Sequence, residues 1–456
     1  MPRVYTSDVA GRDEDIVARN IWRLLHFRFP GATVSHRSAF EYGPSPNKNI
    51  YLTWTENRVL KWPGITVKVS AGPPALPGDR SPFPDGVRIS SEERALLENL
   101  SIARKIGGEA RTIDRAAIEK RLLNILNTRG EEGLNAVRDT ARAIAEQLDL
   151  QQEFQELDAL IGALMATKSS EALRSPFAIA HALGEPYDAG RLALFETLIR
   201  ALKGHAFPMR TELDKTVQAF ANIAFFESYF SNYIEGTRFD VKDARDIIYR
   251  GAHIPNRAGD SHDVKGTYAI CSDREEMSLR PKTPAEMLDV LKRRHATLLG
   301  GRPEMWPGQF KERPNRAGST WFVDPGQVLG TLKQGYELVN LLTDPVARAL
   351  YIMFLVSEVH PFNDGNGRIA RVMMNAELVA HGCTKLIIPN VYREDYMLAL
   401  RRLSRERDAG PYIRMMDRAH AWSHWLVPSS LDDLQQRITE SNAFKEPDEG
   451  ALVWPN

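Results

Sequence analysis

The stretch His360-Pro-Phe-Asn-Asp-Gly-Asn-Gly-Arg-Ile-Ala-Arg371 decides the fold of the C-terminal part of this 456-residue chain. It stands between two apolar segments, Ala347–Val359 and Ile369–His381, whose patterns predict a core helix on each side. Pro361 prevents the first helix from continuing, and Gly382 is a suitable end for the second. The stretch is therefore a loop that leads into the N-terminus of a helix.

The backbone and the arginines of this loop suit the binding of phosphate. Gly365 and Gly367 allow the main chain to approach a ligand closely. Together with Asn366 they place successive N–H groups at a helix start, which forms a nest for anionic oxygens. Arg368 and Arg371 lie one turn apart, so both guanidinium groups can reach the same site and bind phosphate oxygens.

Two further side chains of the loop supply the remaining chemistry. Asp364 offers hard oxygen ligands for a Mg²⁺ ion that bridges phosphates. His360 can accept a proton from an incoming hydroxyl, a step worth about 10²–10⁴ in rate. An ordinary helix–loop–helix turn with surface arginines would explain any one of these residues, but not all of them together. A Walker phosphate loop fits less well, because Gly-Lys-Ser/Thr is absent.

The twelve residues resemble the signature of the Fic (filamentation) family, His-Pro-Phe-x-Asp/Glu-Gly-Asn-Gly-Arg-x-x-Arg, at every specified position. The likeness extends over roughly residues 195–420. It implies a helical Fic fold that transfers AMP from ATP to a protein hydroxyl and releases pyrophosphate. The roles that the resemblance implies are a general base at His360, a Mg²⁺ ligand at Asp364, an anion hole at Gly365, Asn366 and Gly367, and phosphate clamps at Arg368 and Arg371.

The segment Gly308–Pro325 predicts a β-hairpin or extended flap, because it combines turn residues with alternating ones. It is located where the family has a flap that holds the target segment by strand addition and borders the nucleotide. The residues that this resemblance places at the border are Gly318, Ser319, Thr320 and Trp321. A hairpin core explains the pair Trp321-Phe322 equally well.

A second segment, Ser231-Asn-Tyr-Ile-Glu235-Gly236, resembles the family's inhibitory pattern Ser/Thr-x-x-x-Glu-Gly/Asn. A glutamate held against Arg371 would occupy the clamp that the γ-phosphate needs. A charge pair near 4 Å at an effective dielectric constant of about 20 is worth roughly 4 kcal/mol before desolvation. The alternative is an ordinary helix end, with Gly236 as the stop signal and Glu235 in solvent. Because the pattern lies in the same chain, the resemblance implies self-inhibition in cis.

The sequence departs from the family pattern in the region that lines the base. Tyr396 is retained, but Met397 stands where many relatives have a second tyrosine that lines the adenine pocket. Ser404 is located where some relatives use asparagine to read the base. Selectivity for adenine over other bases therefore stays open.

Composition limits the class of protein. Apolar residues make up 43% and charged residues 26%, as in ordinary globular proteins. Lysine plus arginine and aspartate plus glutamate both number 59, so the overall charge gives no support for a nucleic-acid or membrane protein. The distant pair Cys271 and Cys383 argues against a disulfide framework or a zinc site. We expect a cytoplasmic enzyme without a membrane helix.

The chain divides by composition into regions that are mostly helical, which predicts the mainly α class. We expect a small α+β module at residues 1–95, a helical connecting region at 96–190, the Fic catalytic domain with its inhibitory helix at 191–430, and a loosely held tail at 431–456. In the first module the expected elements are a helix at Asp15–Phe29 and strands at Gly31–His36, Ile50–Trp54 and Ile65–Val69.

The N-terminal module has a separate, weaker likeness. Phe29–Phe40 resembles stretches in regulators and antitoxins of abortive-infection systems, which are associated with winged-helix modules. Basic residues in and near this stretch would form one face for DNA: Arg19, Arg23, Arg28, His36 and Arg37. A module that docks protein explains the same residues equally well.

The leading hypothesis is a self-inhibited, Mg²⁺-dependent protein adenylyltransferase that uses ATP to modify a Ser, Thr or Tyr hydroxyl of a protein, including its own. Removal of AMP, or transfer of another nucleotide at the same site, is an alternative. A nucleotide-sensing transcriptional or antitoxin-like regulator is a second one. The target protein, the signal that relieves inhibition and the oligomeric state are not fixed by the sequence.

Overall fold

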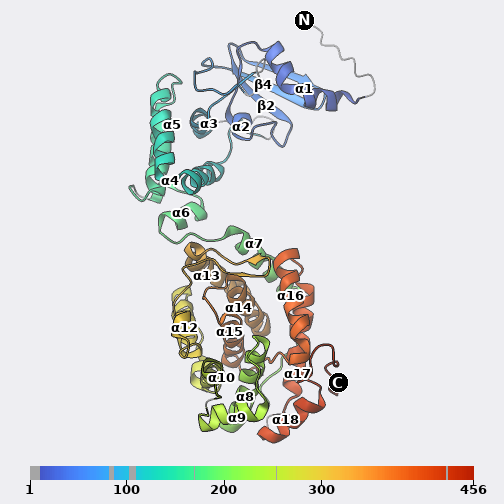
Figure 1. Ribbon diagram of the computed structural model, residues 1–456. Helices are drawn as coiled ribbons and strands as arrows, with labels where there is room; N and C mark the ends of the chain where they lie inside the picture. The colour runs from blue at the N-terminus through green and yellow to red at the C-terminus, as the bar shows by residue number, and fades with distance from the viewer. Residues whose placement is uncertain are drawn as a thin grey trace. The chain divides into compact units, whose positions relative to one another are not determined.

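The computed structural model describes residues 11–81, 87–101, 109–168, 170–252, 254–427 and 430–455. The chain forms two compact units, Met1–Gly184 and Glu185–Asn456 (Figure 1). Residues 1–10, 82–86 and 102–108, which fall in the expected N-terminal module and connecting region, lie outside the described part. Helices dominate both units and strands are few, which confirms the predicted mainly α class.

The first unit opens with a sheet of five strands in the order β3-β4-β2-β1-β5. Its elements are α1 (Asp13–Arg28), β1 (Thr33–Val34), α2 (His36–Phe40), β2 (Asn49–Trp54), β3 (Arg58–Trp62), β4 (Ile65–Ala71) and β5 (Arg88–Ile89). The predicted helix and three strands are present. The strand expected to reach His36 ends earlier, because His36 has φ +51° and begins α2. The edge strand β3 was not predicted, since its charged residues obscure the alternation.

Four longer helices complete the first unit and have a core of their own. They are α3 (Glu92–Leu100), α4 (Arg115–Ala145), α5 (Gln151–Leu164) and α6 (Pro176–Ala182). Ser91 caps α3 by accepting a hydrogen bond from the Arg94 N–H, as the Ser-Glu-Glu start predicts. Gly130, with φ +68°, kinks α4 in its middle. The apolar side chains of these helices form a cluster separate from that of the sheet.

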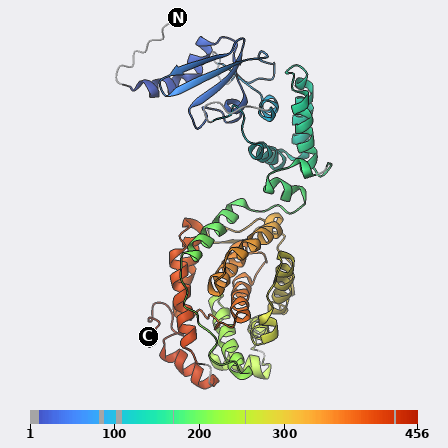
Figure 2. The same ribbon diagram turned by 180° about the vertical axis from the view of Figure 1, so that it is seen from behind.

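The second unit is built around two helices, α14 (Pro345–Val359) and α15 (Asn366–Ala380), which lie side by side in its interior (Figures 1 and 2). Nearly every residue of α14 is buried, as its apolar sequence predicts. The surrounding helices are α7 (Ala189–Lys203), α8 (Val217–Ile234), α9 (Val241–Arg250), α10 (Ala258–Cys271), α11 (Arg274–Ser278), α12 (Pro284–Leu298), α13 (Val328–Glu337), α16 (Arg393–Glu406) and α17 (Gly410–Trp425). The predicted hairpin is present as β6 (Arg316–Ala317) and β7 (Thr320–Trp321).

The C-terminal residues differ from the loosely held tail that we expected. Leu431–Glu440 forms the helix α18, whose Leu434 and Ile438 are completely buried. Their spacing of four residues places both on one face, and that face joins the main core of the second unit. Leu452, close to the C-terminus, is buried in the same cluster.

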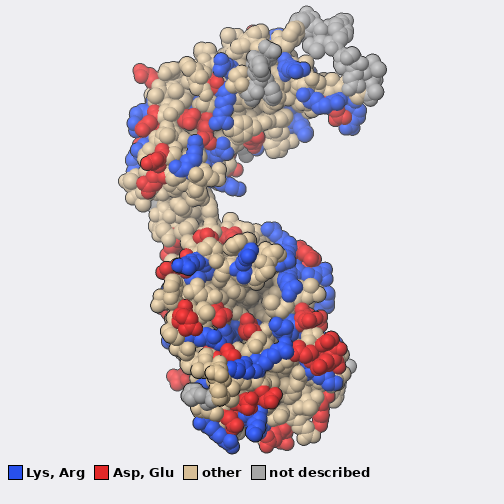
Figure 3. Space-filling view, viewed as in Figure 1, with Lys and Arg blue, Asp and Glu red and all other residues tan. Residues whose placement is uncertain are grey.

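The surface carries both signs of charge. On the face drawn in Figure 3, lysine and arginine are interspersed with aspartate and glutamate over both units. Within the described part of the chain, no helix combines the length and the apolar character needed to cross a bilayer.

Candidate active site

The signature loop connects the two central helices of the second unit. α14 ends at His360, which has φ +53° and lies in the left-handed region. The chain then turns, and α15 begins after Gly365, whose φ of +73° suits a residue without a Cβ. The side chain of Asn366 holds this turn closed, because it accepts from the Phe362 N–H and donates to the Phe362 carbonyl, both at 2.8 Å. Asn366 can therefore offer an anion only its backbone N–H.

His360 is oriented by two contacts. Its Nδ1 donates to the Ser357 carbonyl at 3.2 Å, since a carbonyl can only accept. Its ring stacks on Phe322, with ring centroids 3.7 Å apart and planes 4° from parallel. Phe322 comes directly after β7, so it belongs to the flap and covers the histidine instead of filling a hairpin core. The Nε2 atom is thereby left with the lone pair.

Electrostatics keep His360 in its neutral form. Burial lowers the pKa of His360 to about 4, and the nearby Lys311 ammonium acts in the same direction. Lys311 is itself buried, and this burial lowers its pKa to about 8. Its Nζ donates to Asn315 at 2.7 Å, and the Asn315 amide donates to the Phe362 carbonyl at 3.0 Å. A neutral imidazole can accept a proton at pH 7.

Glu235 and Arg371 meet at the N-terminus of α15. Arg371 Nη2 donates to Glu235 Oε1 at 2.7 Å and to the Ser231 carbonyl at 2.9 Å, while its Nε donates to Ser231 Oγ at 3.0 Å. A Cβ placed on Gly367 would lie 2.2 Å from the same Glu235 oxygen. The carboxylate therefore fills the space over Gly367 that a side chain would otherwise occupy.

The end of α8 explains why Glu235 reaches this place. Gly236, with φ +94°, stops the helix, and Glu235 becomes its C-cap. A carboxylate is unfavourable at a helix C-terminus and favourable at a helix N-terminus. Glu235 satisfies that preference by lying against the start of α15, so the predicted solvated helix end does not describe this residue.

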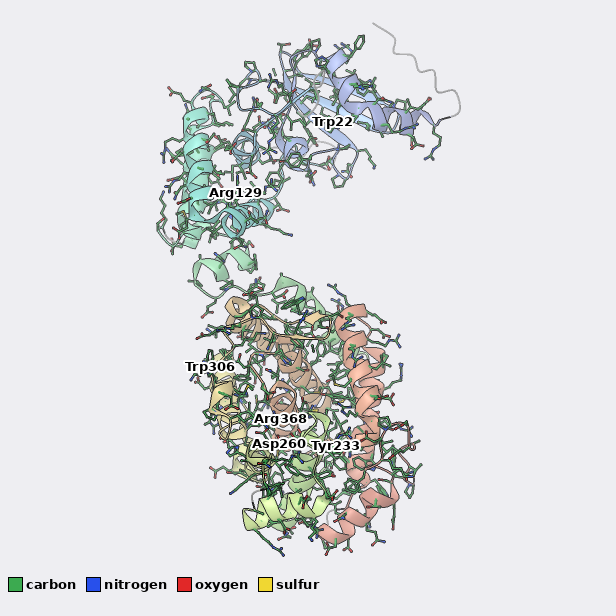
Figure 4. The ribbon with its side chains drawn as sticks, in the orientation of Figure 1. Trp22, Arg129, Tyr233, Asp260, Trp306 and Arg368 are labelled. Carbon is green, nitrogen blue, oxygen red and sulfur yellow. The ribbon has the colours of Figure 1, made fainter. Side chains whose placement is uncertain are left out.

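Arg368 and Arg371 have different partners, although their spacing allowed a shared site. Arg368 is buried, as its label in the interior of the helical unit in Figure 4 indicates, and its Nη1 pairs with the fully buried Asp263. Its Nη2 lies 3.4 Å from Asp364 Oδ2. Asp263 also pairs with Arg302, at 2.9 Å. Arg368 thus connects the loop to α10, with one nitrogen directed at the Asp364 carboxylate.

His295 of α12 supports the loop from below, and the sequence gave no sign of it. Its Nδ1 accepts from the Gly308 N–H at 2.9 Å, so its Nε2 carries the proton and donates to the Asp364 carbonyl at 3.0 Å. Its ring stacks on Phe362, with centroids 3.6 Å apart. Burial lowers the pKa of His295 to about 4.

The flap is held by two arginines. Arg405 of α16 donates through Nε and Nη2 to Thr320 Oγ1, at 3.0 and 2.6 Å. Arg191 of α7 donates to the Trp321 carbonyl at 2.6 Å. Gly318, with φ +59°, forms the tip of the hairpin with Ser319, and the Trp321 side chain is 57% exposed. The flap residues that we proposed as a nucleotide border are therefore held towards α7 and α16.

The expected base region lies beside Arg371 and under the flap. Tyr396 is buried, and its hydroxyl accepts from Arg371 Nη1 at 3.5 Å. Ser404 donates to Glu358 Oε1 at 2.9 Å. Burial raises the pKa of Glu358, which also pairs with Arg191. A buried carboxylate thus stands behind the position at which some relatives have asparagine.

The residues present fit a Mg²⁺ ion. The Asp364 side chain is 44% exposed, and Asp364 Oδ1 accepts from the Gly365 N–H at 2.7 Å, which leaves lone pairs for a hard cation. Among the described residues no cluster of three or more His, Cys, Asp or Glu side chains could hold a metal. Mg²⁺ is commonly bound through one or two carboxylates plus substrate phosphates and water. The cradle at Gly367, filled here by a carboxylate, has the character that such phosphates require.

Several residues of this site were not found from the sequence. They are Asp263, His295, Lys311, Asn315 and Phe322. The last three lie within the predicted flap segment, so its extent was the available signal. Nothing in the local patterns around Asp263 and His295 distinguishes them from other polar residues on amphipathic helices, because the contacts they make are distant in sequence.

Comparison with known proteins places this geometry in context. The family model described as "Fic/DOC family" matches residues 286–378. Protein adenylyltransferase Fic of Drosophila persimilis is 28% identical over 234 residues, covering 49% of this chain and 46% of that protein. Protein adenylyltransferase fic-1 of Caenorhabditis elegans is 27% identical over 195 residues, covering 42% and 38%. The chain thus spans less than half of the length of these relatives.

Two solved structures were also found. A Fic domain containing signaling protein from Bacteroides thetaiotaomicron has a TM-score of 0.41 and 20% identity, over 53% of this chain and 97% of that one. Fic-1 from C. elegans has a TM-score of 0.38 and 21% identity, over 75% and 96%. The signature loop, α12, α14 and most of α15 all fall within the residues that the family model matches. This chain therefore carries a domain of the Fic/DOC family.

Proposed function

We propose that this protein is a self-inhibited, Mg²⁺-dependent adenylyltransferase that transfers AMP from ATP to a hydroxyl side chain of a protein. One observation carries the proposal: the Glu235 carboxylate rests on Arg371 and over Gly367, at the start of a helix. A helix N-terminus with an arginine is an anion site. The carboxylate stands in for phosphate oxygens of ATP, so the same atoms that would bind substrate are occupied by the inhibitory residue.

The proposed reaction uses the residues of the signature loop. His360 Nε2 takes the proton from the target hydroxyl, whose oxygen bonds to the α-phosphorus of ATP. The bond from the α-phosphorus to the bridging oxygen breaks, and pyrophosphate leaves with the electron pair. Mg²⁺, when bound by Asp364 and the phosphates, would neutralise the charge of the leaving group. Arg371 and the N–H groups at the start of α15 would hold the terminal phosphates.

Inhibition follows from competition for Arg371. While Glu235 accepts from Arg371 Nη2, the γ-phosphate of ATP meets a carboxylate instead of the guanidinium edge it needs. ATP that binds without this contact would lack alignment of its α-phosphorus with the hydroxyl, which lowers the rate more than the affinity. The side chain of Glu235 is 34% exposed, so it can leave the site without disrupting the core.

Labelling of the full chain tests this proposal. The purified protein is incubated with Mg²⁺ and ATP labelled at the α-phosphate, and label on protein is measured, including on the chain itself. Glu235→Gly should raise incorporation about tenfold or more, which corresponds to about 1.4 kcal/mol in the barrier. Adding His360→Ala should return it to background. ATP labelled at the γ-phosphate should give no label, because pyrophosphate leaves.

A matched variant controls for the effect of glycine at a helix end. Glu440 is the last residue of α18, in the same unit and on its surface. Glu440→Gly should leave labelling at the wild-type level. If Glu235→Gly labels no more than Glu440→Gly does, the inhibitory role is wrong. If His360→Ala keeps the label, His360 is not the base.

A second candidate, transfer of a different nucleotide, is favoured by the buried Glu358. Its carboxylate accepts from Ser404, where an asparagine amide reads the base in some relatives. A carboxylate reads N–H donors, and among the bases guanine presents two of them on one edge. Parallel labelling of the Glu235→Gly variant with the four α-labelled nucleoside triphosphates decides between them. Preferred incorporation from ATP supports adenylyl transfer, and preferred incorporation from GTP supports the alternative.

A further inference from the structure

His295 connects three parts of the active-site region through one side chain. It belongs to α12, accepts from the Gly308 N–H at the entrance of the flap segment, and donates to the Asp364 carbonyl in the signature loop. Both ring nitrogens are therefore occupied by backbone groups of different segments. The ring face stacks on Phe362, with the two planes 4° from parallel. A histidine placed only to fill the core would not need both nitrogens directed at the two segments that border the site.

The contact with Asp364 is made at a place where the backbone has little freedom. The next residue, Gly365, has φ +73°, and a Cβ there would lie 3.0 Å from Leu299 Cδ1 and 3.4 Å from His295 Nε2. The loop thus lies directly on the end of α12. The orientation of the Asp364 carbonyl fixes the peptide between Asp364 and Gly365, and with it the direction of the first N–H groups of α15.

A second backbone tie runs parallel to the first. The Lys311 N–H donates to the Pro361 carbonyl at 2.9 Å, three residues after Gly308. The flap segment is therefore joined to the signature loop at two points, and His295 supplies the joint nearer to Asp364. Loss of this joint would leave a buried N–H and a buried carbonyl without partners, a state that proteins avoid.

We propose that His295 is a positioning residue that holds the Asp364–Gly367 turn in the geometry needed to present Asp364 to Mg²⁺ and the α15 N–H groups to phosphate. The inference rests on the proposed adenylyl transfer. His295 does not touch the reacting atoms; it acts through the Asp364 carbonyl and the Gly308 N–H. The residues that hold metal ligands in place commonly matter almost as much as the ligands themselves.

Two substitutions separate positioning from packing. His295→Phe keeps an aromatic ring of similar shape on Phe362 but removes both hydrogen bonds. His295→Gln keeps an N–H donor at the distance of Nε2 and so can still donate to the Asp364 carbonyl. Both are made in the full chain with Glu235→Gly, so that the site is open.

A matched control is available in α17. His420 is also fully buried, and its Nε2 bonds to the Thr384 carbonyl at 2.9 Å, but it lies among residues outside the signature loop and flap. Burial lowers the pKa of His420 to about 4, as it does for His295. His420→Phe therefore reproduces the loss of a buried histidine bonded to a backbone carbonyl in the same unit.

Three quantities are measured for each variant. They are the thermal midpoint, the kcat and KM of AMP transfer, and the Kd of ATP by calorimetry with and without Mg²⁺. His295→Phe should lower kcat about 10- to 100-fold and raise the ATP Kd in Mg²⁺ about tenfold, as loss of a metal-orienting contact does. The Kd without Mg²⁺ should change less than about threefold, and His295→Gln should recover most of the loss. His420→Phe should lower only the thermal midpoint.

Other results would overturn the inference. It fails if His295→Phe retains the parent kcat and Mg²⁺-dependent affinity, or if His420→Phe loses kcat to the same extent. It also fails if His295→Gln recovers nothing while its thermal midpoint equals that of the parent. If the parent transfers no AMP but its Mg²⁺-dependent ATP affinity still depends on His295, the proposed function is wrong and the positioning role stands. If the parent binds ATP equally with and without Mg²⁺, both are wrong.

Discussion

His360 is surrounded so that it stays neutral well below physiological pH. Burial lowers its pKa to about 4, whereas an ordinary histidine titrates near pH 6.5. A base works only when it is not protonated, so activity is lost as the pH falls through this pKa. We expect kcat/KM of the Glu235→Gly variant to stay level from pH 8 down to about pH 5 on the acid side. A pH–rate profile with its acid limb near 6.5 would contradict the geometry around the ring.

Lys311 provides a second test of the same residue. Its ammonium lowers the pKa of His360, so removing that charge should raise the pKa and move the acid limb upwards. Lys311→Met in the Glu235→Gly background should therefore lose activity at a higher pH than its parent does. Lys333→Met is the control, because Lys333 pairs with Glu185 on α13 and not with the loop. The acid limb of both variants is measured in the same buffers, and equal limbs would exclude the influence of Lys311.

The residues of the signature were found from the sequence because they are local. Twelve consecutive positions bring a base, a carboxylate, glycines and arginines together without help from the rest of the fold. Glu235 was found for a related reason, since a short pattern with a helix-stopping glycine places it at a defined point. His295, Lys311 and Asp263 act through contacts between segments that are distant in sequence, and no local spacing encodes such contacts.

The flap hairpin depends on neighbours for its position. It contains only two residues in each strand, and such a short hairpin has little stability of its own. Arg405→Ala removes both hydrogen bonds to Thr320, so we expect faster hydrogen exchange at the amides of residues 316–321. Arg402→Ala is the control, because Arg402 pairs with Glu406 and Asp408 one turn earlier on the same helix. Unchanged exchange in Arg405→Ala would show that Arg191 holds the flap alone.

The helix α18 gives a test of the correction to the expected tail. Leu434 is completely buried, so Leu434→Ala should lower the free energy of unfolding of the second unit by about 2–5 kcal/mol. Gln436 lies on the exposed face of the same helix, and Gln436→Ala should change it by less than about 0.5 kcal/mol. Both are measured by urea unfolding. A loosely held tail would give the two variants the same small effect.

The elements differ in how well sequence patterns predict them. The long helices on either side of the loop follow from apolar spacing, and their caps follow from residues such as Asp344, which accepts from the Ala347 N–H. The final helix was missed because polar residues and prolines dominate its surroundings, so two buried side chains four residues apart carried too little signal. β5, with two residues, has no pattern of its own and exists through pairing with β1.

At the level of the whole chain, the apolar residues separate into distinct cores. The second unit has one large core around α14 and α15, whereas the first unit has one core under its sheet and another among α3 to α6. The proposed chemistry uses residues of the second unit only. The N-terminal basic residues that suggested DNA binding lie in the first unit, so a role in recruiting partners can be tested apart from catalysis.

Separate cores predict that damage in one unit leaves the other folded. Leu160 lies in the helical core of the first unit and Leu350 in the core of the second, and both are completely buried. Replacing either with alanine should destabilise its own unit by about 2–5 kcal/mol. For units of this size, that corresponds to a fall in thermal midpoint of about 4–20 °C. Differential scanning calorimetry should then resolve two transitions, of which each variant lowers one. Labelling with α-labelled ATP below both transitions should be retained by Leu160→Ala in the Glu235→Gly background, because His360, Arg371 and their supporting residues belong to the second core. A single transition that both variants lower equally would mean that the two units unfold as one, and the proposed division of roles between them would then lose its physical basis.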